Sequence, residues 1–320
     1  MVFKKITLLI SAALFSAATL SAAGFKSDEL LKNPDILADT VESGLADFSE
    51  QISHSITMGT TQQNIWADAY IGKVFPSPIP HFGGGVNLGA TRVDSSGLAQ
   101  AAGALGIGGL SDYYYYPMWT ADVRVGGFIL PFDLDFSFMK TGSLSLDTGK
   151  ADLAVDLLTF GVDARYAILE GSLLMPKLSV GLGYFYNSGS FSLESPTGSI
   201  DMDYSMHTLY GSLQLSKSFI FCTPFVGLRG IVTMTECDYD WKAKGIYKES
   251  VETVVPGIKT SGSGSNDSDG FDFGGIQPQF FAGVGFNFLV FQTTLSVSAD
   301  LRNVWDKGLW SGVLSIRAKL

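Results

Sequence analysis

The chain has 320 residues, of which 46% are hydrophobic and only 16% are charged. Soluble domains usually carry about 25% charged residues, yet after the N-terminus no stretch supplies the roughly 18 consecutive apolar residues that a membrane-spanning helix needs. Acidic residues outnumber basic ones by 31 to 21, and no basic cluster offsets them, so nucleic acid is excluded as a partner.

The first 23 residues have the parts of a secretion signal. Lys4 and Lys5 form the positive region, residues 6–18 the apolar core, and Ser21 to Ala23 a small-residue cleavage site. We predict a signal peptide over 1–23, cleaved after Ala23. Because cleavage removes two lysines, 19 basic residues remain against 31 acidic ones, a net charge of −12.

Helical periodicity is confined to the next segment. Asn33-Pro34-Asp35 is typical of a helix start, and apolar residues then recur at spacings of three and four. These residues are Ile36, Leu37, Val41, Leu45, Phe48 and Ile52. We predict an N-terminal amphipathic helix within residues 24–51 that lies in the lumen of a barrel as a plug or rests in the periplasm.

From Ile52 to the end, apolar residues alternate with polar ones, as in strands with unlike faces. Short connections also alternate with long polar or glycine-rich ones, a pattern typical of a transmembrane barrel. The expected strands are 65–73, 82–92, 118–127, 132–139, 157–166, 178–187, 207–215, 223–234, 276–288, 291–301 and 309–320, with 52–59 as a weaker twelfth. The fold class is therefore an all-β, antiparallel, up-and-down transmembrane barrel over 52–320, of about 12 strands, with 10 to 14 possible.

A soluble sandwich or lipocalin-like barrel would alternate too, but it would carry an exterior rich in Lys and Glu. Here the polar face is mostly Ser, Thr, Gly and Asn, and the apolar face holds too many bulky aromatic residues for one small core. Aromatic residues at strand ends, such as the run Tyr113 to Tyr116, suit belts at two membrane interfaces. The apolar face is expected to meet lipid.

On this pattern, residues 52–320 resemble the outer-membrane β-barrel proteins of bacteria, porin-like but without an assigned subfamily. The final stretch LWSGVLSIRAKL, residues 309–320, looks like the terminal strand of that family, although Leu320 stands where many members have an aromatic residue. The resemblance implies an exported protein of the cell outer membrane. Its expected partners are outer-membrane lipid and, through the last strand, the barrel-insertion machinery.

Charged residues gather on the expected inner face. The pattern Asp-x-Arg occurs three times in strands, and residues two apart share a face. The tight turn before Phe132 sets Arg124 opposite Asp133 or Asp135, depending on the register. We name as the lumenal charge cluster Asp122, Arg124, Asp133, Asp135, Asp163, Arg165 and Arg229, with Asp300 and Arg302 at the extracellular end of the lumen.

Two functions follow. In the first, the charge cluster is a constriction that selects small solutes, and the protein is a channel or transporter; the alternative for the cluster is that its charges neutralise one another and fill a narrow barrel. In the second, the barrel anchors long loops, chiefly 235–275 and 94–117, for surface display or adhesion to extracellular macromolecules.

An enzyme is not expected. The two carboxylates of PFDLDFSF face an arginine that keeps them ionised, and the three histidines, His54, His81 and His207, fall in separate segments. No metal or cofactor is expected either; the loop 261–275 lacks the closing acid of a calcium loop and is interpreted as mobile and acidic. Cys222 and Cys237 lie along one expected strand, too far apart for a disulfide.

Overall fold

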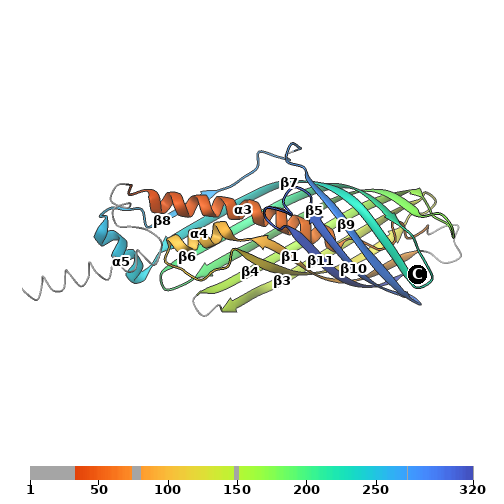
Figure 1. Ribbon diagram of the computed structural model, residues 1–320, viewed down its shortest axis with the longest axis horizontal. Helices are drawn as coiled ribbons and strands as arrows, with labels where there is room; N and C mark the ends of the chain where they lie inside the picture. The colour runs from red at the N-terminus through yellow and green to blue at the C-terminus, as the bar shows by residue number, and fades with distance from the viewer. Residues whose placement is uncertain (1–32, 74–80, 148–150, 272, 320) are drawn as a thin grey trace, which may run out of the picture.

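The computed structural model describes residues 33–73, 81–147, 151–271 and 273–319; the predicted signal peptide and its cleavage site lie outside them. Ten described strands close into one antiparallel barrel (Figure 1), in the order β6-β5-β4-β3-β2-β1-β11-β10-β9-β7, and β6 pairs with β7 to complete it. The barrel strands are β1 (Phe82–Asp94), β2 (Tyr113–Gly126), β3 (Phe132–Asp147), β4 (Asp152–Leu169), β5 (Lys177–Glu194), β6 (Gly198–Ser216), β7 (Cys222–Ala243), β9 (Gln277–Phe288), β10 (Phe291–Asp300) and β11 (Trp310–Lys319).

The two ends of the barrel differ. Strands β2 and β3, β4 and β5, β6 and β7, and β9 and β10 are joined by short turns at one end, where the described chain also finishes. The opposite end carries the helices α4 (Ser96–Ala104) and α5 (Gly245–Val254) and the short strand β8 (Ser261–Ser265), which pairs with β7 beside the barrel. We call these the short-turn end and the long-loop end.

The second half of helix α3 (Ile36–Gln63) is buried almost throughout within the barrel, whereas its first half keeps Asp39, Ser43 and Glu50 exposed. Its first residues are at the long-loop end, where Glu42 pairs with Lys259 at 2.7 Å. Its first half buries Leu37, Leu45 and Phe48 in an apolar core, whereas its last turns bury threonine and glutamine side chains. Helix α4 crosses it so closely that the crossing uses glycine on both sides, Gly44 and Gly97.

The outward and inward faces of the strands exchange polar and apolar side chains between the two ends of the barrel. On β6, the outward side chains near the short turn are Leu209, Leu213 and Leu215, but further along they are Asp201 and Asp203. The inward side chains change in the opposite sense. Gln214 and Thr208 give way to Met206, Tyr204, Met202 and Ile200, which belong to the apolar core around α3. The barrel therefore has a polar interior near the short turns and an apolar interior near the long loops.

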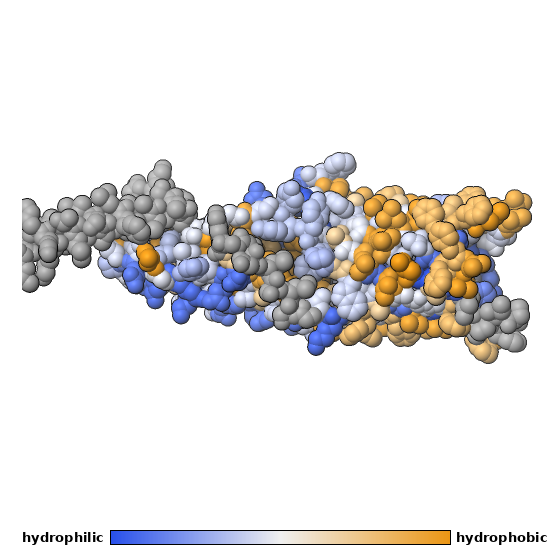
Figure 2. Space-filling view, turned by 90° about the horizontal axis from the view of Figure 1, so that it is seen from below, coloured by the Kyte–Doolittle hydropathy of each residue, from blue (hydrophilic) through white to orange (hydrophobic). Residues whose placement is uncertain are grey.

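An apolar belt surrounds the short-turn half (Figure 2), and the long-loop half is hydrophilic outside. The belt extends over the short turns, where Leu174, Ile220 and Leu289 are almost fully exposed. Its strand residues include Val86, Leu88, Val123, Val125, Phe136, Phe138, Phe160, Tyr166, Val180, Leu182, Leu213, Leu215, Val226, Leu228, Phe280, Phe286, Leu295, Val297, Leu314 and Ile316. No helix among the described residues is long and apolar enough to cross a membrane.

Three expectations are corrected. The barrel has ten described strands, the lower limit of the expected range. The segments 52–59 and 65–73 are not strands, because 52–59 continues helix α3 and 65–73 runs through the lumen without pairing into the sheet. Strands β3 to β7 extend up to nine residues beyond their expected long-loop ends. The loops 94–117 and 235–275 contain α4, α5 and β8, and β8 lies within the segment 261–275 that was expected to be mobile.

Candidate functional site

The candidate site is the polar lumen of the short-turn half, which the chain itself occupies. After α3 ends, residues 64–70 continue through the lumen, and all seven are buried. We call residues 63–71 the plug segment. Gln63 ends α3 and residues 64–71 form no helix or strand, so the buried carbonyl groups of this segment need partners from the barrel wall.

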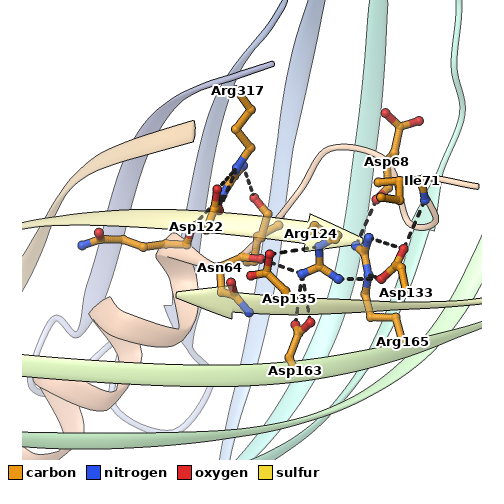
Figure 3. Close-up of polar contacts among 12 residues, drawn as sticks. Asn64, Asp68, Ile71, Asp122, Arg124, Asp133, Asp135, Asp163, Arg165 and Arg317 are labelled. Carbon is orange, nitrogen blue, oxygen red and sulfur yellow. Dashed lines mark hydrogen bonds and ion pairs between the residues drawn. The ribbon is translucent and has the colours of Figure 1, made fainter. Parts of the chain in front are cut away.

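The wall supplies those partners from widely separated strands (Figure 3). Arg317 of β11 donates to the carbonyl oxygens of Gln63 and Ile65, at 2.8 and 2.7 Å. Gln214 of β6 donates to the carbonyl of Trp66 at 2.7 Å, and Arg165 of β4 to that of Asp68 at 3.0 Å. The plug segment is therefore held through its main chain.

The first ion pair of the lumen joins Arg317 to Asp122 of β2. The Arg317 guanidinium donates through Nε and Nη2 to Asp122 Oδ2, at 2.9 and 2.6 Å. Its Cζ atom lies 4.8 Å from the ring centre of Trp66, and the side chains of Arg317 and Asp122 are both inaccessible to solvent. One arginine thus neutralises a wall carboxylate and binds the plug segment at the same time.

The second network contains five residues of the predicted cluster. Arg124 donates to Asp133 at 2.6 Å and pairs with Asp163 at 2.9 Å and Asp135 at 3.5 Å. Arg165 donates a hydrogen bond to each carboxylate oxygen of Asp133, both at 2.9 Å. The β2–β3 register pairs Arg124 with Asp135, the second of the two expected registers.

A third group centres on Asp68, which the plug segment contributes. Its carboxylate receives Lys177 at 2.9 Å and Gln292 at 3.2 Å, and it also pairs with Lys319. Strand β5, strand β10 and strand β11 thus meet at one carboxylate. Asp133 also accepts a hydrogen bond from the backbone N–H of Ile71 at 3.1 Å, so the segment is fixed at its end as well.

The remaining predicted residues lie elsewhere. The guanidinium of Arg229 is stacked between the rings of Tyr210 and Phe281, at 4.7 and 5.2 Å, rather than in the ion-pair networks. Asp300 is buried at the end of β10, where it accepts hydrogen bonds from the backbone N–H groups of Arg302 and Asn303. Arg302 is exposed in the following turn, so its expected place in a strand facing the lumen is wrong.

Sequence reasoning missed the partners inside the lumen. The residues 65–73 alternate sufficiently to be predicted as a strand, although Trp66 and Asp68 both lie inside the barrel. A usable signal was the large number of charged residues expected on the inner face of the wall, because buried charges require partners close by. Chemically, the arrangement neutralises much of the wall charge and fixes the plug segment. Among the described side chains, the carboxylate of Asp135 accepts no hydrogen bond and Arg229 forms no ion pair.

No family model matches the sequence, and no curated protein matches it. The structure resembles solved outer-membrane β-barrels. The translocator domain of the autotransporter NalP from Neisseria meningitidis is 9% identical, with 87% of this chain and 98% of that chain covered and a TM-score of 0.34.

Two further solved structures are similar to this chain. The β domain of the Bordetella autotransporter BrkA is 11% identical, covers 75% of this chain and 100% of its own, and has a TM-score of 0.36. Ail, the attachment invasion locus protein of Yersinia pestis, is 11% identical over 75% of this chain and 97% of its own, with a TM-score of 0.20. Scores this low carry no argument about function, and the closed barrel rests on the strand pairing itself.

Proposed function

We propose that this protein is an outer-membrane barrel that holds a folded, strand-built domain at the cell surface while its own N-terminal segment keeps the lumen closed. The apolar belt would lie in the membrane, with the short turns at its periplasmic surface. The long-loop half, with α4, α5 and β8, would stand outside the cell.

The exchange of polarity along the strands carries this proposal. A transmembrane strand needs about 9 to 11 residues, whereas β6 has 19 and β7 has 22. The additional residues of β6 and β7 do not suit contact with lipid, because their outward side chains are acidic. Asp201 lies directly opposite Asp240, and Asp203 opposite Asp238, and like charges so placed require water to screen them. The apolar inner face and α3 then form an ordinary water-surrounded core.

Passage of small solutes, the first function expected from the sequence, requires the plug segment to leave the lumen. That movement would separate Asp68 from Lys177 and Lys319 and break the hydrogen bonds from Arg317 and Arg165 to carbonyl groups of the segment. A hydrogen bond to a charged group contributes about 1.5 to 3 kcal/mol. Several such contacts hold the segment together, so the closed state is favoured. Surface display, the second expected function, needs no movement.

Labelling of intact cells tests the orientation. In a Cys222→Ser background, Asp238→Cys should react with a membrane-impermeant maleimide, since Asp238 is exposed on the long-loop half. Leu174→Cys, in the turn between β4 and β5, should react only after the cells are opened. Labelling of Leu174→Cys on intact cells with protection of Asp238→Cys would reverse the orientation and refute the proposal.

Planar-bilayer recording tests the closed lumen separately. Purified protein should show no steady current above that of the bare bilayer. The double variant Arg317→Ala, Arg165→Ala removes three donors to carbonyls of the plug segment, and it should raise the frequency of transient openings. A steady current through the unaltered protein would favour the channel function.

A further inference from the structure

The barrel wall has a seam. Strands β2 and β3 pair only between Ala121 and Gly126 on one side and Asp133 and Phe138 on the other. Beyond this, β2 stays paired with β1 as far as Tyr113, and β3 stays paired with β4 as far as Asp147. Two strand edges, 113–120 and 139–147, therefore face each other without a hydrogen-bonded ladder between them.

Behind β2 lies an apolar pocket of about 150 Å³. Helix α3 contributes Phe48 and Ile52 to its wall, β4 contributes Val155, and β5 contributes Leu193. Helix α4 contributes Leu98 on the side toward the long loops. None of the described lining residues is charged, so the pocket offers nothing to a lipid headgroup or an acidic peptide.

On β2 the pocket is lined by residues 114–117, next to the outward-facing Trp119. Phe138 is the last outward residue of β3 before Lys140, and it is about half exposed. On the β2 side, Tyr115, another lining residue, is half exposed and packs edge-on against Trp310 at 5.7 Å. A molecule dissolved near the membrane interface would meet this aromatic rim before it met the lumen.

We propose that this pocket is a binding site for a small apolar molecule the size of a single aromatic ring, which enters sideways between β2 and β3. A dry cavity of about 150 Å³ lined by aliphatic and aromatic side chains holds benzene, and this pocket has that size and lining. Entry from the lumen is closed by α3, whose residues form the inner wall. The site is independent of what the surface loops contact.

The test uses the full chain in lipid nanodiscs with fluorobenzene as the probe, followed by the width of its ¹⁹F signal. The unaltered protein should broaden the signal beyond protein-free nanodiscs in a saturable way. Leu193→Trp fills the pocket and should weaken binding at least tenfold. Val180→Trp adds the same ring on the lipid-facing side of the same strand and should leave binding unchanged.

A second variant keeps the proposal testable if Leu193→Trp does not fold. Val155→Ala enlarges the pocket without adding bulk, and it should extend binding to 1-fluoronaphthalene, which the unaltered protein should exclude. The proposal is overturned if fluorobenzene broadens no more than in empty nanodiscs. It is equally overturned if Leu193→Trp, shown to be folded, binds as well as Val180→Trp, or if Val155→Ala gains no larger ligand.

Discussion

At the scale of single residues, arginine side chains determine what the lumen contains. Arg317 binds one carboxylate of the wall and two carbonyl groups of the plug segment. Arg165 likewise donates hydrogen bonds both to the carboxylate of Asp133 and to the carbonyl group of Asp68. The guanidinium group suits this task because it presents five donors in a rigid fork. A lysine could neutralise the same carboxylate but could not also hold the plug segment in the same geometry.

Removing Arg317 should therefore be costly. Arg317→Ala leaves Asp122 buried without its partner, and we expect the free energy of unfolding, measured in urea from phospholipid vesicles, to fall by about 3 to 5 kcal/mol. Arg302→Ala removes an equally large side chain from an exposed turn and should change stability by no more than about 0.5 kcal/mol. Equal effects of the two substitutions would contradict the assigned role of Arg317.

The reactivity of the Cys237 thiol tests whether the interior of the long-loop half is closed to solvent. Burial raises the pKa of its thiol to about 12, and the thiolate is the form that reacts with maleimide. In a Cys222→Ser background, Cys237 should therefore stay unlabelled at pH 8 and react faster as the pH rises. Asp238→Cys, the outward neighbour, should label within minutes at pH 8. Rapid labelling of Cys237 would mean that the core around α3 is open.

The register of this residue-scale network was only partly predictable. Period-two alternation placed Arg124 and Asp133 on one face, and the odd sum of paired positions left two registers open. The structure adopts the one that pairs Arg124 with Asp135, while the closest contact of Arg124 is still to Asp133. Side-chain length lets an arginine reach a diagonal neighbour, which alternation cannot indicate.

At the scale of elements, the exchange of polarity explains what sequence reasoning missed. On β6, the apolar positions are odd-numbered from Leu215 to Leu209 and even-numbered from Met206 to Ile200. A change of phase ends a period-two pattern, so the strand was predicted to begin at His207 although it begins at Gly198. Helix α4 was missed for a different reason, since its small residues, such as Ala101 and Gly103, resemble a glycine-rich loop.

The crossing of α3 and α4 should depend on two glycines. A Cβ atom at Gly44 would lie 2.5 Å from the carbonyl oxygen of Gly97, and such overpacking costs about 1 to 3 kcal/mol. We expect Gly44→Ala to lower the melting temperature even though alanine favours helix by up to about 1 kcal/mol.

Gly103→Ala is the matched control for this crossing. A Cβ atom at Gly103 meets nothing within 4 Å, so the substitution should leave the protein as stable or slightly more stable. If both alanine variants raised the melting temperature, the close packing of the two helices would be refuted.

At the scale of the whole molecule, the path of the chain is as informative as the barrel. Helix α3 begins beside Lys259 at the long-loop end, and the chain reaches β1 at the short-turn end only after passing through the lumen. The sequence predicted a barrel with an N-terminal helix, but the periodicity of a helix does not indicate at which end of the barrel the helix begins. The direction follows from three-dimensional contacts alone.

An inserted tag reports this direction. An epitope placed between Lys32 and Asn33 should be recognised by antibody on intact cells, because Asn33 lies next to the start of α3 at the long-loop end. The same epitope placed after Leu174, in a short turn, should be recognised only in opened cells. Recognition of the second tag alone on intact cells would reverse the assigned topology.

The proposed function requires that one set of strands crosses the membrane and then continues as a water-surrounded domain. Spin labels placed one at a time along the outward face of β6, in vesicles, test it most directly. The positions are Asp201, Asp203, Ser205, His207, Leu209, Leu213 and Leu215. Labels at 209, 213 and 215 should be accessible to oxygen dissolved in lipid. Labels at 201, 203 and 205 should instead be accessible to a water-soluble nickel complex, and the accessibility should switch from one reagent to the other near His207. A strand accessible to only one of the two reagents along its whole length would contradict this arrangement.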